Sequence, residues 1–379
     1  MLKNMVSRWF EERFDVQAVK EPLEYQLRKP LPRNIGWFHT FGSMSLFLFV
    51  SQVLTGILLL IYYRPTEGEA FESVKFIMTQ PYAGWLFRQV HAWGANLMIL
   101  MVTIHMMRTY VTGSYKKPRE LTWLIGVGLF MMTLVFGFTG YLLPWNQLAY
   151  WATTVGTEIA GAVPGIGEFA KTLMRGGVNV GGETLSRFFV LHVIVLPWAL
   201  FFLIGFHIFL VRFQEMSTLD AVGEEKKTKP EDGIPFFPDH LLKEGVVFFV
   251  LMGVLITLSI LAPFELGEKA NPLSTPVGIK PEWYFMPMYH ALKYFPKVFG
   301  VLLLGMAPLF LFIWPFVDRG RNRHPLKRPV SMTLGIITFV VVIFLGTLGC
   351  LSESKQNFFG KVYEFDIYGV PHQVTEQKL

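Results

Sequence analysis

The chain has 379 residues, of which 52% are hydrophobic and only 16% are charged. A soluble domain carries about 25% charged residues, so this composition excludes an ordinary soluble enzyme and indicates a membrane protein. The basic residues behind the net charge of +6 lie in short loops between apolar runs, which favours control of membrane topology over binding of nucleic acid. The single cysteine, Cys350, excludes an internal disulfide and a cysteine-ligated metal site.

Residues 1–36 lack the apolar core of a signal peptide. Met5, Trp9, Phe10 and Phe14 fall near one face of a helix, which predicts an amphipathic segment on the membrane surface. Seven runs without charged residues follow, each close to the ~20 residues needed to cross a bilayer. They are 38–63, 89–107, 121–143, 188–211, 245–264, 298–317 and 329–352. The sequence therefore predicts an all-α, polytopic membrane protein with seven transmembrane helices, the first four forming a bundle.

Charge and loop composition predict the orientation and the domains. The N-terminal segment and the loops on its side of the membrane hold 21 Lys and Arg, and the opposite side holds 13. By the positive-inside rule, the N-terminus faces the cytoplasm and the C-terminus faces outside. The polar stretch 220–242 is predicted to be a linker between a four-span domain, 37–219, and a three-span domain, 243–379. The long outer loops 144–186 and 265–297 are partly apolar, which predicts short interfacial helices in the first and a binding site near that surface.

Four of the nine histidines lie inside two predicted spans, where ionisable residues are costly and therefore candidates for function. Counted along the chain, His105 stands at i+14 from His91, and His207 stands at i+15 from His192. Both intervals are close to four helical turns, so the two rings of each span leave one face, roughly 21 Å apart. The two spans are parallel, so His91 can face His192 near the outer side and His105 can face His207 near the inner side. Each pair could clamp one haem as axial iron ligands, whereas isolated histidines in spans more often serve as polar packing groups or proton relays.

Glycines repeat at a matching interval in the first and third spans. The pairs are Gly42 with Gly56 and Gly126 with Gly140. Glycine lets a flat ring approach a helix backbone, although small residues also serve ordinary helix packing. Arg88 and Arg108 flank the second span and could bind haem propionates, or they could simply anchor the span at the interfaces.

Four segments carry a resemblance that covers nearly the whole chain. They are GWLFRQVHAWGANLMILMVTIHMMR (84–108), GFTGYLLPWNQLAYWATTV (137–155), RFFVLHVIVLPWALFFLIGFHIFLVR (187–212) and PEWY (281–284). In these segments and their order, the sequence resembles cytochrome b of quinol-oxidising bc complexes. It is similar to the photosynthetic-type b subunit joined to its three-span partner, because the interval from His192 to His207 has the length typical of that type and the chain stops after the seventh span.

The resemblance implies a quinol:cytochrome c-type oxidoreductase subunit with two b haems that contributes to proton translocation. The low-potential haem would be held by His91 and His192 near a quinol-oxidising site, and the high-potential haem by His105 and His207 near a quinone-reducing site. The outer site would use Glu282 of PEWY as proton acceptor, because a carboxylate in an apolar loop has a raised pKa. Tyr141, Tyr150 and Tyr284 are weaker candidates for lining that outer pocket.

At the inner site, the resemblance implies Asp239 as proton donor. Arg212 stands where mitochondrial forms have a histidine, and it could stabilise a semiquinone anion or hold a haem propionate. Thr40 stands where the photosynthetic type has a cysteine that binds an extra haem, which excludes covalent attachment there. A third haem held without a covalent bond stays open.

The family further implies a Rieske iron–sulfur protein and a c-type cytochrome as partners, a homodimeric complex and a bacterial cytoplasmic membrane. The quinone could be ubiquinone, menaquinone or plastoquinone. Two other classes fit the histidines alone: a di-haem membrane anchor of a dehydrogenase or hydrogenase, and a transporter with histidine proton relays. The anchors lack PEWY and the two large outer loops, and a transporter would show no b-haem absorption.

Overall fold

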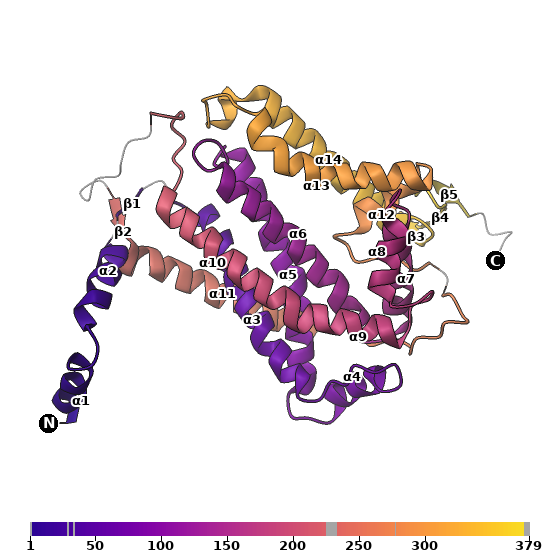
Figure 1. Cartoon of the computed structure of the whole chain (residues 1–379). Coiled ribbons are helices and arrows are strands. Elements are labelled where there is room, and N and C mark those ends of the chain that lie inside the picture. Colours follow the sequence, from indigo (N-terminus) through magenta and orange to yellow (C-terminus); the bar gives the residue numbers. More distant parts are fainter. Residues whose placement is uncertain (1, 29, 33–34, 225–232, 277, 375–379) are drawn as a thin grey trace.

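The structure, a computed structural model, describes residues 2–28, 30–32, 35–224, 233–276 and 278–374 (Figure 1). Within these residues, seven helical segments are long and apolar enough to cross a membrane. They are Phe41–Leu60, Gly84–Val111, Glu120–Leu142, Gly182–Gln214, Phe236–Leu261, Lys297–Val317 and Pro329–Leu351. The prediction of seven spans is therefore confirmed.

The first three spans are α3 (Phe41–Leu60), α5 (Gly84–Val111) and α6 (Glu120–Leu142). The fourth is composite: α9 (Gly182–Val190) passes through a π-helical turn, η2 (Leu191–Val195), into α10 (Leu196–Gln214). Pro197, in the first turn of α10, has no N–H to donate to the carbonyl four residues earlier. A π turn holds one residue more than an α turn. The π turn therefore accommodates its extra residue where Pro197 already breaks the α-helical hydrogen bonding.

The remaining spans are α11 (Leu241–Leu261), which follows the short π-helical turn η4 (Phe236–His240), α13 (Lys297–Val317) and α14 (Pro329–Leu351). Helix α11 packs on α3 and α5, and α13 packs on α6. A buried core joins the first, second, fourth and fifth spans: Leu48, Phe49, Met98, Met101, Leu200, Leu251 and Leu255. Between 6% and 33% of each span is fully buried in the protein, which leaves much of the span surface for lipid.

Short helices cover the outer ends of the spans. Between the first and second spans lies α4 (Ala70–Thr79), and the predicted short helices of the first long outer loop are present as α7 (Gln147–Gly161) and α8 (Gly167–Arg175). The second long outer loop contains α12 (Met286–Leu292). On the opposite face, the 3₁₀ turn η1 (Trp37–His39) precedes α3 and the 3₁₀ turn η5 (Pro325–Lys327) follows α13.

Hydrogen bonds hold the second outer loop against the first domain. The Gln89 side chain donates to the Phe264 carbonyl over 2.9 Å and accepts from the Phe264 amide over 2.8 Å. Asn146 Nδ2 donates to the Leu266 carbonyl over 2.7 Å. These contacts fix the path of the loop that leads to the PEWY segment.

The chain is mostly helical, as predicted, and the described residues also form two small sheets. Strands β1 (Pro30–Pro32) and β2 (Gly233–Pro235) pair antiparallel, so the end of the predicted linker lies beside the N-terminal segment. The other sheet has the order β3–β4–β5, formed by Lys355–Phe358, Lys361–Phe365 and Pro371–Gln373. Such short strands carry too few alternating positions to be read from sequence. Residues 225–232 of the linker lie outside the described residues.

The N-terminal segment forms two helices, α1 (Leu2–Glu11) and α2 (Val16–Arg28), which extend away from the spans (Figure 1). The exposed rings of Trp9, Phe10 and Phe14 lie within 5.1–6.4 Å of one another. This aromatic face agrees with the predicted amphipathic surface segment.

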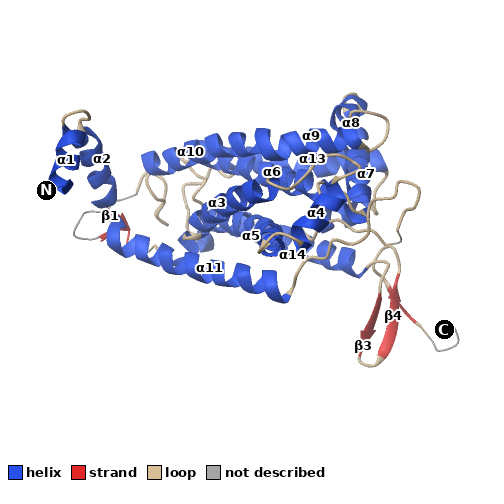
Figure 2. Cartoon of the chain, turned by 90° about the horizontal axis from the view of Figure 1, so that it is seen from below, coloured by secondary structure: helices blue, strands red, loops and turns tan. Residues whose placement is uncertain are grey.

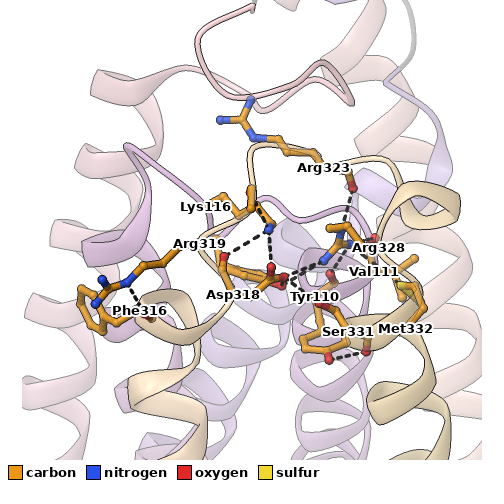
Figure 3. A network of polar contacts seen from close by, with 12 residues as sticks. Tyr110, Val111, Lys116, Phe316, Asp318, Arg319, Arg323, Arg328, Ser331 and Met332 are labelled. Atoms are coloured by element: carbon orange, nitrogen blue, oxygen red, sulfur yellow. Dashed lines mark hydrogen bonds and ion pairs between the residues drawn. The ribbon is translucent and has the colours of Figure 1, made fainter.

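A buried ionic network joins the two domains at the end opposite PEWY (Figure 3). Asp318, which follows α13, accepts hydrogen bonds from Lys116 Nζ over 2.6 Å, from Tyr115 over 2.5 Å and from Ser331 over 2.9 Å. Arg328 lies 3.4 Å from the same carboxylate. Burial alone would raise the pKa of Asp318, but the hydrogen bonds from Lys116, Tyr115 and Ser331 outweigh it and hold that pKa below its ordinary value.

Candidate functional site

Helix α5 carries His91 and His105, and the composite fourth span carries His192 in η2 and His207 in α10. The ring centroids of His91 and His192 are 6.4 Å apart, and those of His105 and His207 are 6.5 Å apart. The pairing of rings expected from the spacing is therefore present. The π turn explains how the i+15 interval of the fourth span can match the i+14 interval of α5, because the turn takes up the extra residue without rotating His207 away.

Each of the four rings lies against one of the four predicted glycines. A Cβ on Gly140 would lie 2.5 Å from His192 Cε1, and one on Gly42 would lie 3.1 Å from His105 Cε1. The corresponding distance is 3.4 Å for Gly56 to His91 and for Gly126 to His207. The glycines thus accommodate the imidazoles of the neighbouring spans, a role that the sequence reading had given to haem contact.

Neighbouring threonines orient the outer pair of rings. Thr55 Oγ1 lies 2.9 Å from His91 Nδ1, and Thr139 Oγ1 lies 3.2 Å from His192 Nδ1. A ring fixed through one nitrogen can present the other to a metal, which is how axial histidines are usually held. Among the described residues, no group of three or more His, Cys, Asp or Glu could hold a bare metal ion. This donor set fits two bis-imidazole haem sites.

The two flanking arginines differ in their partners. Arg88 donates a hydrogen bond to the Phe264 carbonyl. Arg108 Nε is buried and has no hydrogen-bond partner among the residues that the structure describes, as expected for a guanidinium whose anionic partner is a bound group. The inner arginine therefore fits a propionate more directly than the outer one.

Helix α6 links the outer pair of histidines to Glu282, because two consecutive residues of this helix lie beside the two groups. Gly140 contacts the His192 ring, and the next residue, Tyr141, lies close enough to the Glu282 carboxylate to lower its pKa. Burial raises the pKa of Glu282, and the Tyr141 hydroxyl only partly offsets that rise. The structure thus brings a carboxylate with a raised pKa near the outer rings.

Other residues of PEWY are held by the first domain. Tyr284 lies so close to Gly137 that a Cβ there would be 2.8 Å from its hydroxyl, and Trp283 Nε1 donates to Asn96 Oδ1 over 2.7 Å. Burial raises the pKa of Tyr284, so its hydroxyl stays protonated. Tyr150 is instead buried, with its hydroxyl donating to the Val180 carbonyl over 3.3 Å, which leaves it little freedom to meet a quinol.

The inner pair of histidines lies near a second ionisable pair that the sequence reading missed. His240 Nε2 is 3.1 Å from Glu244 Oε1, and Ser43 Oγ donates to that same carboxylate oxygen over 2.9 Å. Ser43 directly follows Gly42, which contacts the His105 ring. His39 lies nearby, and burial followed by the charge of Arg108 lowers its pKa to about 4. The i,i+4 spacing of His240 and Glu244 at the start of a span was a signal that could have found this pair.

The two predicted inner-site residues lie at the edge of this group. Asp239 is exposed, next to the buried His240. Arg212 is also exposed, with its guanidinium carbon 4.6 Å from the centroid of the Phe236 ring. Asp239 and Arg212 therefore lie on the surface side of the His240–Glu244 pair.

Comparisons with known proteins agree with this arrangement. The family described as "Cytochrome b/b6/petB" matches residues 26–215, and "Cytochrome b(C-terminal)/b6/petD" matches residues 269–365. The chain is 42% identical over 347 residues to "Cytochrome bc complex cytochrome b subunit" of Chlorobaculum thiosulfatiphilum, covering 90% of this chain and 80% of that protein. It is 36% identical over 363 residues to "Cytochrome b" of Rhodospirillum rubrum, covering 93% and 87%. A solved chain of "Hyperthermophilic respiratory Complex III" superposes with a TM-score of 0.84 at 32% identity, covering 92% of both chains.

Seven spans with two pairs of facing imidazoles inside them define a multi-pass membrane protein with an arrangement typical of haem-binding electron-transfer proteins. The chain belongs to the cytochrome b family, and it is the cytochrome b subunit of a bc-type quinol:cytochrome c oxidoreductase. The predicted family and function are confirmed. Membership of this family implies b haems as cofactors and partner subunits in the complex.

Proposed function

We propose that His91 and His192 hold a low-potential b haem near the outer side, and that His105 and His207 hold a high-potential b haem near the inner side. The observation that supports this assignment is the pairing of rings at 6.4 and 6.5 Å, each with a glycine backbone behind it. When bound, the haems would carry single electrons between the two sides of the membrane. Arg108 would neutralise a propionate of the inner haem, and Arg88 would do so at the outer one only by giving up the Phe264 carbonyl.

At the outer site, Glu282 accepts a proton as quinol loses its electrons. Its raised pKa brings it closer to neutral pH, where a group can both take and release a proton. Tyr141 orients the carboxylate, and Tyr284 offers a protonated hydroxyl beside it. One electron from each quinol leaves to a Rieske iron–sulfur protein and then to a c-type cytochrome.

At the inner site, the His240–Glu244 pair supplies protons to the quinone under reduction. Burial of this pair and its link through Ser43 to the helix turn that contacts His105 favour it as the immediate donor. Asp239 lies on the surface beside His240, where it can pass protons inward. Arg212 adds positive charge beside Phe236, which favours an anionic form of the quinone.

The same proposal includes the placement of the subunit. The excess of Lys and Arg on the N-terminal side favours a cytoplasmic N-terminus. The subunit would lie in a bacterial cytoplasmic membrane as part of a homodimeric complex. A third haem at the inner site would have to be held without a covalent bond, because Thr40 donates its hydroxyl hydrogen to the Trp37 carbonyl and offers no thiol.

A redox-titrated optical spectrum of the purified complex, with a haem stoichiometry for this subunit, tests the assignment. We expect two b haems with separate midpoint potentials. Three haems would require a different description of the inner site, and a subunit without haem would contradict the proposal. Loss of one haem in His91→Ala and of the other in His105→Ala would assign each potential to its pair.

A further inference from the structure

The C-terminal sheet lies at the depth at which the last span ends. Only three residues separate the end of α14 from β3. The turn between β4 and β5 packs on the last turn of that helix, because a Cβ on Gly369 would lie 3.0 Å from the Leu348 carbonyl oxygen. Lys293 Nζ donates to the Ile367 carbonyl over 3.0 Å, and the Phe365 amide donates to the Ser354 carbonyl over 2.9 Å. The base of the sheet is therefore fixed at one membrane boundary.

The register of β3 and β4 gives this hairpin two different faces. One face is polar, with Lys355 and Glu364 opposite each other and their charged groups 3.8 Å apart. The opposite face carries three aromatic rings beside Gln356 and Lys361. On this face, the Phe358 ring lies 6.3 Å from Tyr363 and 6.2 Å from Phe365. A stripe of aromatic rings thus runs from the base of the sheet to its tip.

This aromatic stripe becomes more exposed toward the tip. The exposed fraction is 6% for Phe365, 43% for Phe358 and 104% for Phe359. Phe359 also adopts a left-handed backbone conformation, with φ of +52°, which is unusual for a bulky residue. In Figure 2 the hairpin projects beyond the helices and across the direction of α10 and α11. Two phenylalanines therefore extend sideways from the end of a span.

We propose that this tip inserts into the interfacial region of the lipid bilayer on the side of the PEWY loop. The interface extends roughly 5–7 Å beyond the hydrocarbon core on each side. Because only three residues connect α14 to β3, the sheet stays within reach of this interface. The lipid-facing side chains of α14, such as the exposed Ile343 and Phe344, lead toward the sheet, so lipid is already the neighbour along this edge. Aromatic side chains in this zone anchor a protein at the membrane surface.

Fluorescence of a labelled tip tests the proposal in the intact complex reconstituted into phosphatidylcholine vesicles. Cys350→Ser removes the one native thiol of this chain, and Phe359→Cys then carries an environment-sensitive fluorophore. The complex with Cys350→Ser alone gives the background from other subunits. Asn357→Cys, which lies opposite Val362 on the polar face, is the matched control.

We expect the label at position 359 to show blue-shifted emission, quenching by nitroxide lipids and protection from aqueous iodide. The label at 357 should show the reverse. Iodide quenching at both positions would mean that the tip stays in water and would overturn the proposal. Protection at 359 from both quenchers would also overturn it, because a protein, either another subunit or a second copy of this chain, would then cover the tip. Haem content equal to that of the unlabelled complex confirms that the variants fold.

Discussion

Glu282 is a half-buried carboxylate that lies close to the Tyr141 hydroxyl. Replacement by Gln keeps the shape of the side chain but removes its ability to take a proton. We expect Glu282→Gln to slow quinol oxidation by roughly 10²-fold or more, a typical loss for a general base, with both b-haem bands retained. Stopped-flow reduction of the haems by quinol measures this effect. Glu268→Gln, an exposed carboxylate of the same loop, should be neutral, and full activity in Glu282→Gln would exclude the assigned role.

The pH dependence follows from the direction of the Glu282 pKa. The pKa is raised by burial, so the carboxylate forms only as the pH rises past a value above that of an ordinary glutamate. Because the base must be ionised to accept a proton, quinol oxidation should increase with pH through that raised pKa. The Gln variant should lack this limb of the profile. An unchanged profile would mean that another group accepts the proton.

Glycine positions behind the histidines differ in how much space they leave. A Cβ on Gly140 would lie 2.5 Å from the His192 ring, whereas one on Gly126 would lie 3.4 Å from the His207 ring. Gly140→Ala must therefore displace its histidine, at a cost of about 1–3 kcal/mol for overpacking, while Gly126→Ala makes an ordinary contact. Haem stoichiometry should show loss or altered potential of the outer haem in the first variant only. Equal effects would mean that the glycines pack something other than the rings.

Sequence could predict the histidine pairs because they depend on a helical period within two spans. It could not predict the contact of Tyr141 with Glu282, since these residues are far apart in the chain and meet only through the fold of the outer loop. Nor could the sequence show that Glu244, rather than Asp239, lies in the protein interior. A resemblance gives residue types, whereas burial depends on which side chains the fold turns inward. The role of these residues in proton transfer remains a prediction.

At the level of secondary-structure elements, the spans were predictable from their lack of charge. Three features were not. The strands β1 and β2 are very short and are stabilised by pairing between distant parts of the chain. The sheet of β3, β4 and β5 follows α14 after a linker too short to mark the boundary in the sequence. The π turn left a visible trace, the i+15 interval between two histidines against the i+14 interval of their partners, but an interval alone cannot say where the extra residue is taken up.

The π turn leads to a prediction of its own. Deleting the exposed Ile194 shortens the interval from His192 to His207 by one position, so that it equals the interval from His91 to His105 and an α-helix can continue in register. We expect both haems to be retained. Deleting Leu203, in regular α-helix, shortens the same interval but leaves the π turn of residues 191–195 in place, so His207 should turn by about 100° and the inner haem should be lost. The haem stoichiometry of the two variants compares them directly, and loss of haem in both would contradict the role given to the π turn.

At the scale of the whole molecule, Asp318 balances two buried cations, Lys116 and Arg328, between the two domains (Figure 3). Asp318→Asn leaves these cations without a counter-charge, which typically costs about 3–5 kcal/mol. We expect a lower thermal unfolding temperature of the purified complex. The exposed Asp220→Asn, on the same side, should leave it unchanged. An unfolding temperature equal to that of the unmodified complex would show that the network contributes nothing to stability.

The sign of the pH effect is set by the lowered pKa of Asp318. Its contribution is fully present above the ordinary aspartate pKa of about 3.9 and is lost as the pH falls through the lower folded value. The difference in unfolding temperature between the unmodified complex and Asp318→Asn should therefore be large at neutral pH and should vanish in acid. A difference that persisted in acid would point to lost packing rather than lost charge.

Both proposed quinone sites combine residues of the first four spans with residues of the last three, whereas the histidine pairs lie within the first four. Ser43 donates a hydrogen bond to Glu244, and Tyr141 lies close to Glu282. Strand β1 pairs with β2, which directly precedes the fifth span. During synthesis, the first four spans can therefore acquire their haems while neither substrate pocket exists. On the proposed assignment, a nascent chain would hold a complete electron path with no point of entry or exit, which would prevent premature reaction with quinol until the last spans are inserted.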